Sequence, residues 1–153
     1  MKVCVGGTFN KLHKGHKFLL NKAFESAGAN GVVYIGLARG TLVKNKKNIK
    51  PFSERKKTLK NFLHRKKFLR QAKIVPIYKK YGLTLIEDYD AIVVSPETVK
   101  IAEEINFKRK QMGRQQLKII KIPYILSEDG KPISSTRINN KEINENGKII
   151  TED

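Results

Sequence analysis

The chain has 153 residues, of which 39% are hydrophobic and 30% are charged, so its composition is typical of a folded protein rather than a disordered one. A chain of this length forms one domain, and 32 Lys and Arg residues against 14 Asp and Glu give it a net charge of +18. Such an excess attracts polyanions, including nucleotides, pyrophosphate and RNA.

The apolar and cysteine residues disfavour membrane and disulfide-rich proteins. No apolar run approaches the roughly 20 residues that cross a bilayer, and no signal-peptide pattern opens the chain. The single cysteine, Cys4, has no second cysteine for an internal disulfide or a metal cluster. We therefore expect a cytoplasmic protein without a membrane partner, in which Cys4 is a small core residue.

Strand and helix patterns alternate along the chain, which is typical of a parallel sheet covered on both faces. The predicted strands are short apolar runs at residues 2–5, 32–37, 74–77, 91–94 and 117–122. They predict a single-domain α/β fold over residues 1–153, Rossmann-like and doubly wound, with a five-stranded parallel sheet. In such a fold ligands bind at the carboxyl ends of the strands. The tail from about residue 141 is polar, and we expect it to be loosely packed.

Helical patterns fill the segments between the predicted strands. The first should run from about residue 16 to 27 and be closed by Gly28. A long basic helix should open near residue 51 with Ser53 as its N-cap. Its expected buried stripe has helical spacing: Leu59, Phe62, Leu63 and Leu69. The next helix, ended by Gly113, carries five apolar residues: Val99, Ile101, Ala102, Ile105 and Met112. A short last helix should begin near Ser135.

The positive charge is concentrated in residues 44–73, which hold thirteen Lys or Arg residues and one acidic residue, Glu54. A solvated helix face explains most of these side chains, together with His64 among them. A phosphate-facing role for a few of the lysines is compatible with this interpretation.

Two histidines follow the first predicted strand and a glycine-threonine turn. The turn is Gly6-Gly7-Thr8-Phe9, and the histidines lie in His13-Lys14-Gly15-His16 at the start of a helix. Backbone N–H groups and the positive end of the helix dipole meet at such a place. The imidazoles add donors that can follow developing negative charge. This pattern predicts a nucleotide site.

A second hydroxyl-rich segment opens the last predicted helix. Ser134, Ser135 and Thr136 precede Arg137, so hydroxyls, free N–H groups and a guanidinium should form an anion pocket. Alone this signal is weak, because a serine pair before a helix is usually a cap.

The segment from Gly6 to His16 resembles the signature of the nucleotidylyltransferase superfamily, Thr-Phe-Asp…His-x-Gly-His. Class I aminoacyl-tRNA synthetases carry a related form, but 153 residues are too few for such an enzyme. The Val-Val-Ser-Pro-Glu-Thr run ending at Thr98, followed by Asn106 and Arg109, resembles the archaeal and eukaryotic type of phosphopantetheine adenylyltransferase. This resemblance covers nearly the whole chain and implies AMP transfer from ATP to 4′-phosphopantetheine, giving dephospho-coenzyme A and pyrophosphate.

The resemblance also implies residue roles. His16 would donate to the α-phosphate, and Lys44 would bridge both reactants, with Lys46 and Lys47 as competitors for that role. The acceptor phosphate would be bound by Thr8, Lys44 and Lys47. The expected ATP-binding residues are Gly7, Thr8, Phe9, His13, His16, Glu97, Arg109, Ser134, Ser135, Thr136 and Arg137, with Thr98 beside Glu97 and Arg114 as a further candidate. The superfamily closes two helix N-termini on one triphosphate, so the histidine turn and the serine segment should meet. We expect no protein metal site, because Mg²⁺ would be carried by ATP.

Three positions depart from the family pattern. Asn10 stands where the family usually has Asp, and residues 79–83 read Lys-Lys-Tyr-Gly-Leu where it has Asp-x-Tyr-Gly-Pro. Ile101 and Ala102 replace small or glycine residues. The first two departures make a carboxylate-dependent contact at those positions doubtful.

Other functions remain open at this point. The acceptor could be nicotinamide mononucleotide, flavin mononucleotide or glycerol 3-phosphate, although the Ser-Pro-Glu-Thr segment argues against these. A basic RNA-binding module is the alternative outside enzymes. Because no aromatic-rich strand motif accompanies the charge, we expect small-molecule substrates and no specific nucleic acid. The sequence does not indicate an oligomeric state.

Overall fold

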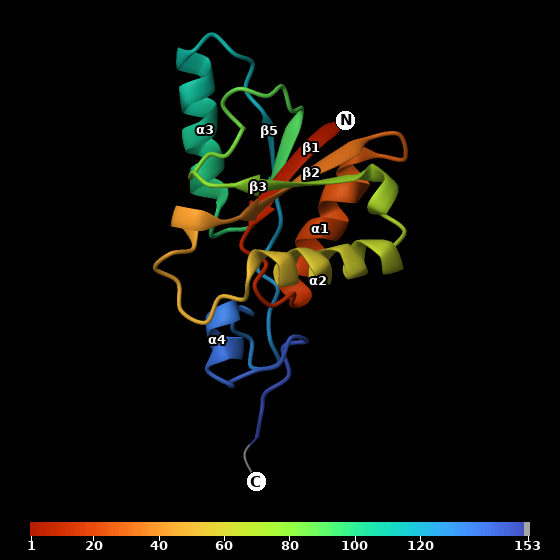
Figure 1. The fold of residues 1–153 in the computed structure, drawn as a ribbon, viewed down its shortest axis with the longest axis vertical. Coiled ribbons are helices and arrows are strands. Elements are labelled where there is room, and N and C mark those ends of the chain that lie inside the picture. Colours follow the sequence, from red (N-terminus) through yellow and green to blue (C-terminus); the bar gives the residue numbers. More distant parts are fainter. Residues whose placement is uncertain (152–153) are drawn as a thin grey trace.

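The computed structural model describes residues 1–151 and contains a single parallel sheet. The strands are β1 (Lys2–Gly7), β2 (Val32–Ala38), β3 (Ala72–Ile77), β4 (Ala91–Val94) and β5 (Lys118–Lys121), in the order β3-β2-β1-β4-β5 (Figure 1). The order reverses beside β1, which pairs with β2 on one side and β4 on the other. This confirms the predicted Rossmann-like fold, and it creates a crevice at the carboxyl ends of β1 and β4.

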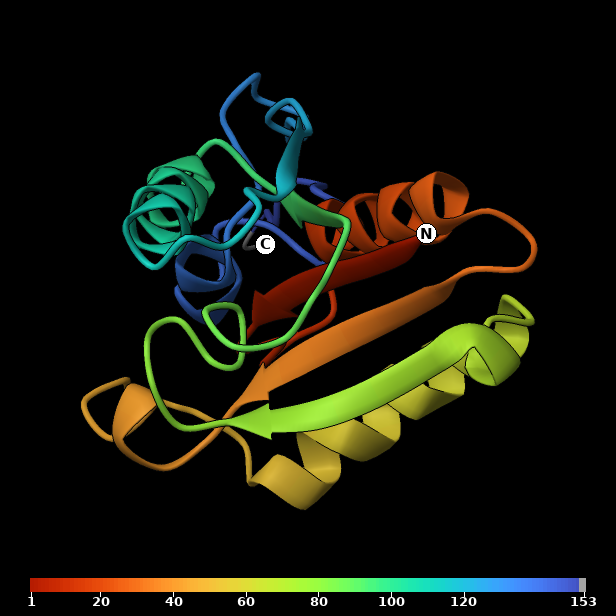
Figure 2. The same ribbon diagram turned by 90° about the horizontal axis from the view of Figure 1, so that it is seen from above.

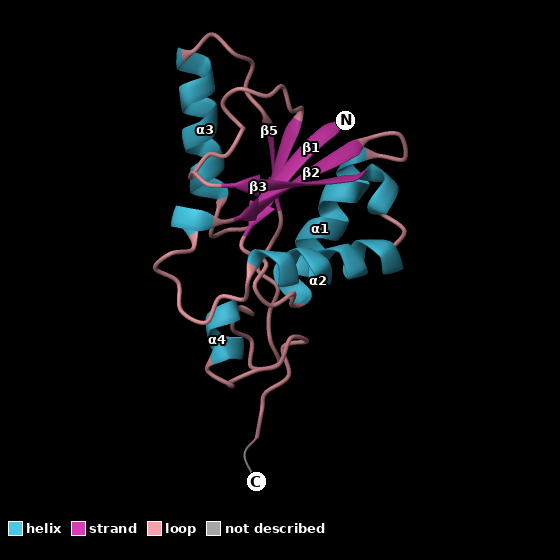
Figure 3. Cartoon of the chain, viewed as in Figure 1, coloured by secondary structure: helices cyan, strands magenta, loops and turns pink. Residues whose placement is uncertain are grey.

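The helices cover both faces of the sheet, as predicted. Three flank the strands and a short fourth follows them: α1 (Lys14–Ala27), α2 (Phe52–Arg65), α3 (Val99–Gln111) and α4 (Ser135–Asn139). Helices α1 and α2 lie on one face of the sheet, and α3 lies on the opposite face (Figure 1). Figure 2, in which the molecule is seen from above, shows β1, β2 and β3 side by side. Figure 3 shows α4 surrounded by loops at one end of the molecule.

The basic helix α2 differs from its prediction at both ends. It begins after Pro51, whose side chain forms no capping hydrogen bond, so Ser53 lies within the first turn and is not the N-cap. Leu59, Phe62 and Leu63 are buried as predicted. Leu69 is 40% exposed and lies in the 3₁₀ turn η2 (Leu69–Gln71), because Lys67 adopts a left-handed φ of 62° and turns the chain out of the helix.

The other element boundaries shift by a few residues. Helix α1 begins two residues earlier than predicted because the His13 side chain caps it. Strand β3 begins earlier, at Ala72, and β5 is shorter than predicted. Gly28 and Gly113 follow α1 and α3 with φ of 82° and 73°, conformations that glycine adopts without strain, so both predicted stop signals are confirmed.

The C-terminal segment is packed around Ile143 and Gly147, which are buried, whereas residues 148–151 are exposed. Ile143 is fully buried against Ile133 and Ile138, and Lys14 N–H donates to the Glu145 carbonyl at 2.8 Å. The segment therefore supports the start of α1. Residues 152–153 lie outside the described part of the chain. Within residues 1–151, no helix combines the length and apolar character that crossing a membrane requires.

Candidate active site

A polar cleft of about 920 Å³ lies at the carboxyl ends of β1 and β4. Its lining comes from five segments that are distant in the sequence: the glycine-histidine turn, the loop around residues 46–49, the Ser-Pro-Glu-Thr segment, residues 122–125 after β5 and the start of α4. The histidine pair and the C-terminal hydroxyl cluster therefore share one cleft. Most of the predicted ATP-binding residues line it: Gly7, Thr8, Phe9, His13, His16, Glu97, Ser134, Ser135 and Thr136.

The start of helix α1 fixes the two histidines. His16 N–H donates to His13 Nδ1 at 3.2 Å, and His13 N–H lies 3.3 Å from His16 Nδ1, which forms a capping box built from imidazoles. The rings stack with centroids 3.6 Å apart. Gly15 is required between them, because a Cβ at this position would lie 2.8 Å from the His13 ring. Phe9, with a φ of 47°, packs its ring 5.2 Å from that of His16.

Both histidines are neutral at neutral pH. Burial lowers the pKa of His13 to about 4. It also lowers the pKa of His16 to about 3, with a further contribution from His13, while the hydrogen bond to the Lys11 carbonyl acts in the opposite direction. His16 Nδ1 lies 3.0 Å from that carbonyl oxygen, which can accept a hydrogen bond from Nδ1–H when the ring is charged.

The lysine beside the glycine-threonine turn is Lys46. Its Nζ donates to Thr8 Oγ1 at 2.7 Å. All three lysines are exposed, but Lys46 and Lys47 line the cleft, whereas Lys44 lies outside the lining. The structure thus brings together Thr8 and Lys46 rather than Thr8 and Lys44. Three lysines within four residues of a loop cannot be ranked from sequence, because the path of the loop decides which one turns inward.

Asn10 sets the path of this loop. Its Nδ2 donates to the Asn48 carbonyl at 2.9 Å, and its Oδ1 accepts from Lys50 N–H at 2.7 Å. An ionised aspartate would accept from Lys50 but could not donate to Asn48. The departure from the family pattern at position 10 is therefore a structural tie between the histidine turn and the lysine loop.

The hydroxyl residues Ser134, Ser135 and Thr136 line the cleft, whereas the neighbouring Arg137 does not. Ser134 Oγ caps α4 by accepting from Arg137 N–H at 3.2 Å. The Arg137 guanidinium points away from the cleft and binds Asp129 and Ser127. These hydrogen bonds, that of Arg137 first, strongly lower the pKa of Asp129. The prediction of Arg137 as a phosphate ligand is thus not supported by the geometry, because its donors already hold the turn before α4.

Two asparagines after the cluster were missed by the sequence analysis. Asn139 and Asn140 line the cleft one turn beyond Ser135 and Thr136. The sequence could have predicted them, because they follow the hydroxyl residues by three to four positions and residues with this spacing share a helix face.

Arg109 is a structural residue on α3. It is 1% exposed, and its guanidinium donates to the carbonyls of Gln115, Thr84 and Glu87. It does not line the cleft, so its predicted role in ATP binding is not supported by its position. Arg114 similarly donates to the Ile86 carbonyl. The charge of each arginine is used to hold the segment that crosses the α3 face of the sheet.

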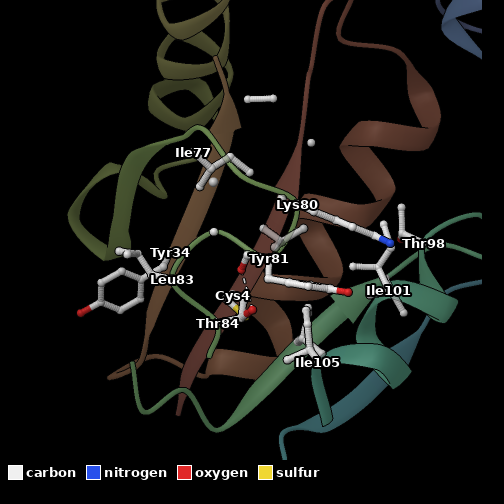
Figure 4. A pocket seen from close by; sticks show the side chains of 18 of the residues that line it. Cys4, Tyr34, Ile77, Lys80, Tyr81, Leu83, Thr84, Thr98, Ile101 and Ile105 are labelled. Carbon is white, nitrogen blue, oxygen red and sulfur yellow. Dashed lines mark hydrogen bonds between the residues drawn. The ribbon is translucent and has the colours of Figure 1, made fainter. Parts of the chain in front are cut away.

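A second cavity, of about 260 Å³, lies between the sheet, α3 and residues 78–89 (Figure 4). Its walls are mainly apolar side chains, among them Ile77, Leu83, Ile101 and Ile105. Five residues line both this cavity and the polar cleft: Gly6, Gly7, Thr8, Lys46 and Thr98. The two spaces therefore meet at Thr8 and Lys46. The feature of the sequence that could have predicted the cavity is the set of small residues on this face of β1 and β2, because small side chains leave space above the sheet.

The departing Lys-Lys-Tyr-Gly-Leu segment forms part of the cavity wall. Tyr81 O–H donates to Glu104 Oε2 at 3.0 Å, and Lys80 Nζ lies 2.9 Å from the same oxygen. The Lys80 hydrogen bond, followed by that of Tyr81, lowers the pKa of Glu104. In this chain the segment has no carboxylate of the kind that the family carries there, and Lys80 and Tyr81 instead contact Glu104 of α3.

The polar cleft offers few metal ligands of its own. Glu97 is the only acidic residue that lines it within residues 1–151. The same part of the chain contains no group of three or more His, Cys, Asp or Glu side chains that could hold a metal ion.

Comparisons with known proteins agree with this geometry. Residues 4–141 match the family model described as cytidylyltransferase-like. Phosphopantetheine adenylyltransferase from Methanosarcina acetivorans is 41% identical over 152 residues, which cover 99% of this chain and 97% of that protein. The enzyme of the same name from Archaeoglobus fulgidus is 40% identical over 98% of this chain and 100% of its own length.

The solved structures include a close relative and a distant one. A crystal structure of a protein with unknown function from Archaeoglobus fulgidus has a TM-score of 0.73 and 37% identity, covering 80% of this chain and 89% of that one. Tyrosyl-tRNA synthetase from the same organism has a TM-score of 0.68 at 16% identity, over 89% of this chain and 59% of the synthetase. The second likeness concerns the fold alone.

Proposed function

This chain belongs to the cytidylyltransferase-like family, and we propose that it transfers AMP from ATP to 4′-phosphopantetheine, giving dephospho-coenzyme A and pyrophosphate. The observation that carries the proposal is the junction of the polar cleft and the apolar cavity at Thr8 and Lys46. ATP is a polar polyanion, whereas the acceptor is a phosphate on a long, mostly uncharged arm. Each space suits one of the two reactants, and their phosphates would meet at the junction.

The reaction needs alignment more than proton transfer. The acceptor phosphate is already ionised at neutral pH, so its oxygen can attack the α-phosphorus of ATP directly while pyrophosphate leaves. No general base is required. Lys46 and Thr8 would hold the two phosphates close together, since Nζ of the lysine and Oγ1 of the threonine already lie 2.7 Å apart.

His16 would stabilise the negative charge that develops on the α-phosphate. A bound triphosphate beside the ring would raise the low pKa of His16, because a nearby anion favours the charged form. The protonated ring would then donate from Nδ1 to the Lys11 carbonyl and from Nε2 to the phosphate. His13, Ser134 and Ser135 would bind the remaining phosphates.

Mg²⁺ fits this site as a companion of the nucleotide. The cleft lining provides hydroxyls and ammonium groups with Glu97 as its acidic residue, so phosphate oxygens would supply most of the ligands of the ion. When bound, the ion would screen phosphate charge. Glu97 and Thr98 would shape the nucleotide pocket beside it.

The alternative acceptors fit the cavity less well. Glycerol 3-phosphate is short and polar, and mononucleotides carry a charged or bulky ring, whereas the cavity has a volume of about 260 Å³ and is mainly apolar. We also propose that the protein is cytoplasmic and has no specific nucleic-acid partner.

An acceptor comparison tests the proposal. Purified protein is incubated with ATP, Mg²⁺ and 4′-phosphopantetheine, nicotinamide mononucleotide, flavin mononucleotide or glycerol 3-phosphate, and pyrophosphate release is measured. A strong signal with 4′-phosphopantetheine alone is expected. Equal or greater release with another acceptor would overturn the proposal.

A lysine pair tests the junction itself. Lys46→Ala should lower kcat/KM for the acceptor by about 10- to 100-fold, because it removes a charge-assisted contact to a phosphate. Lys44→Ala, with the same change in net charge, should stay within twofold of the parent. If Lys44→Ala were the damaging variant, the assignment of Lys46 would be wrong.

A further inference from the structure

A third hollow, of about 540 Å³, lies at the start of helix α2. Four cationic side chains line it: Arg39, Lys46, Lys50 and Arg55. None of the residues that line it is acidic. Like charges so gathered repel one another, and an anion in the hollow would remove that repulsion.

The helix end at the hollow lacks a cap. Pro51 is the N-cap residue of α2, and proline provides no side-chain acceptor for the first-turn N–H groups. The first helical hydrogen bonds are those of Glu54 and Arg55 to the Pro51 carbonyl, both at 3.1 Å. The N–H groups of Phe52 and Ser53 therefore precede the helical hydrogen bonds at the positive end of a 14-residue helix.

Arg55 provides an independent observation that favours an anion site. It is only 2% exposed, yet among residues 1–151 no carboxylate forms an ion pair with it. Its Nε donates to the Lys50 carbonyl, and its Nη1 donates to the carbonyls of Thr8 and Ala38. Within residues 1–151, Nη2 makes no hydrogen bond to a carbonyl oxygen. Because every fully buried polar side-chain atom in this part of the chain has a hydrogen-bond partner, Nη2 is not fully buried. Arg55 lines the hollow, so Nη2 is the group that faces it.

Arg39 completes the arrangement from the other side. Its guanidinium lies 4.6 Å from the centre of the Phe52 ring, whereas that of Arg55 lies 5.8 Å away. The phenyl ring thus positions two guanidinium groups near the uncapped helix end. Burial, followed by the charge of Arg39, lowers the pKa of Arg55, which agrees with two cations that face each other.

We propose that this hollow is a second anion site, which binds a pyrophosphate-type group through Arg39, Lys50, Arg55 and the first N–H groups of α2. The group is either inorganic pyrophosphate or the terminal phosphates of a second nucleotide. The site lies beside the polar cleft, because Lys46 lines both spaces. An anion in the hollow attracts the Lys46 ammonium away from Thr8. Binding in the hollow therefore weakens the Lys46–Thr8 contact at which the reacting phosphates would meet.

Pyrophosphate titration in a filled cleft tests the proposal. The protein is first saturated with a non-hydrolysable ATP analogue, and inorganic pyrophosphate is then titrated by calorimetry. One further pyrophosphate per chain should bind. Arg39→Gln, which alters an exposed side chain, should weaken this binding about tenfold, because one charge-assisted hydrogen bond is lost.

Lys60→Gln is the matched control, since it removes the same charge from an exposed position further along α2. It should change pyrophosphate binding by less than twofold. Equal weakening by both variants, or no pyrophosphate binding when only one analogue molecule is bound per chain, would overturn the proposal. A second analogue molecule bound per chain, and lost in Arg39→Gln, would assign the hollow to nucleotide phosphates rather than to free pyrophosphate.

The titration involves no turnover, so its outcome is separate from that of the proposed enzyme activity. If the ATP analogue itself failed to bind, the proposed function would fail. The dependence of pyrophosphate binding on Arg39 would still decide whether the hollow is an anion site.

Discussion

On the face of the sheet covered by α1 and α2, the side chains of Val33, Ile35 and Leu37 are completely buried, whereas on the α3 face Cys4 and Gly36 border a cavity. The first face is closed by two amphipathic helices whose side chains fill the space. The second is closed by one helix and by residues 78–89, a segment without helix or strand that is held by hydrogen bonds from arginines. One face therefore provides stability, and the other leaves room for a ligand.

The largest expected effect tests the packed face. Leu63→Ala removes a fully buried side chain from α2 and should lower the free energy of unfolding by about 2–5 kcal/mol. Ile101→Ala on the cavity wall should lower it by about 1 kcal/mol or less, because that side chain is only partly buried and already borders empty space. Urea denaturation of both variants measures the difference, and equal losses would contradict the comparison.

His13 and His16 lie at the start of α1, which covers the packed face, but both side chains line the polar cleft. His16→Ala should reduce turnover by about 10²–10³-fold, as expected when a donor to a developing negative charge is removed. His64→Ala on the exposed side of α2 is the control and should leave turnover unchanged. Circular dichroism checks that both variants keep the fold. Equal turnover in His16→Ala and the parent would refute the catalytic assignment.

The pH dependence of stability probes the same turn. The pKa of buried His13 is about 4 in the folded chain and about 6.5 when unfolded, so below pH 6.5 the unfolded state binds more protons. Stability from this group is fully present above pH 6.5 and should fall by about 3 kcal/mol as the pH drops to 4.

His13→Asn separates this titration from the capping role of the residue. Asparagine is a strong N-cap but does not titrate, so the variant should have a flatter stability profile between pH 6.5 and 4. Urea denaturation at several pH values measures it. An unchanged slope would show that His13 is not the titrating group.

The smallest expected effect concerns the cavity wall. Glu104→Gln weakens the contacts of Lys80 and Tyr81 with α3 and should raise KM for the acceptor up to about fivefold, the range of an exposed ion pair. KM for ATP should not change. Glu103→Gln, at the exposed neighbouring position, should alter neither constant. A shift in KM for ATP alone would separate this segment from the acceptor cavity.

The elements of the fold and the centre of the cleft follow from local patterns. Five apolar runs, the glycine stop signals at Gly28 and Gly113, and the two motifs around His16 and Ser134 were all visible in the sequence. Each depends on neighbours within a few positions: a strand needs apolar residues, a helix end needs glycine, and an anion pocket needs N–H groups at a helix start.

The partners of long polar side chains could not be predicted in the same way. Arg109 and Arg137 match expected phosphate ligands by motif, yet their guanidinium groups bind backbone carbonyls and a carboxylate of this chain. Lys44, Lys46 and Lys47 are equivalent by sequence, and the loop tied to Asn10 brings Lys46 to Thr8. Such assignments depend on where distant backbone atoms lie.

The sequence by itself therefore determined the alternation of strands and helices and the chemistry of the two anion-binding turns. The family resemblance implied that these turns meet, but only the tertiary structure decided that an apolar cavity joins their cleft at Thr8 and which of the cationic side chains line the cleft. The reason is physical: secondary structure and capping are short-range, whereas cavities and side-chain partnerships arise when segments separated by tens of residues pack together.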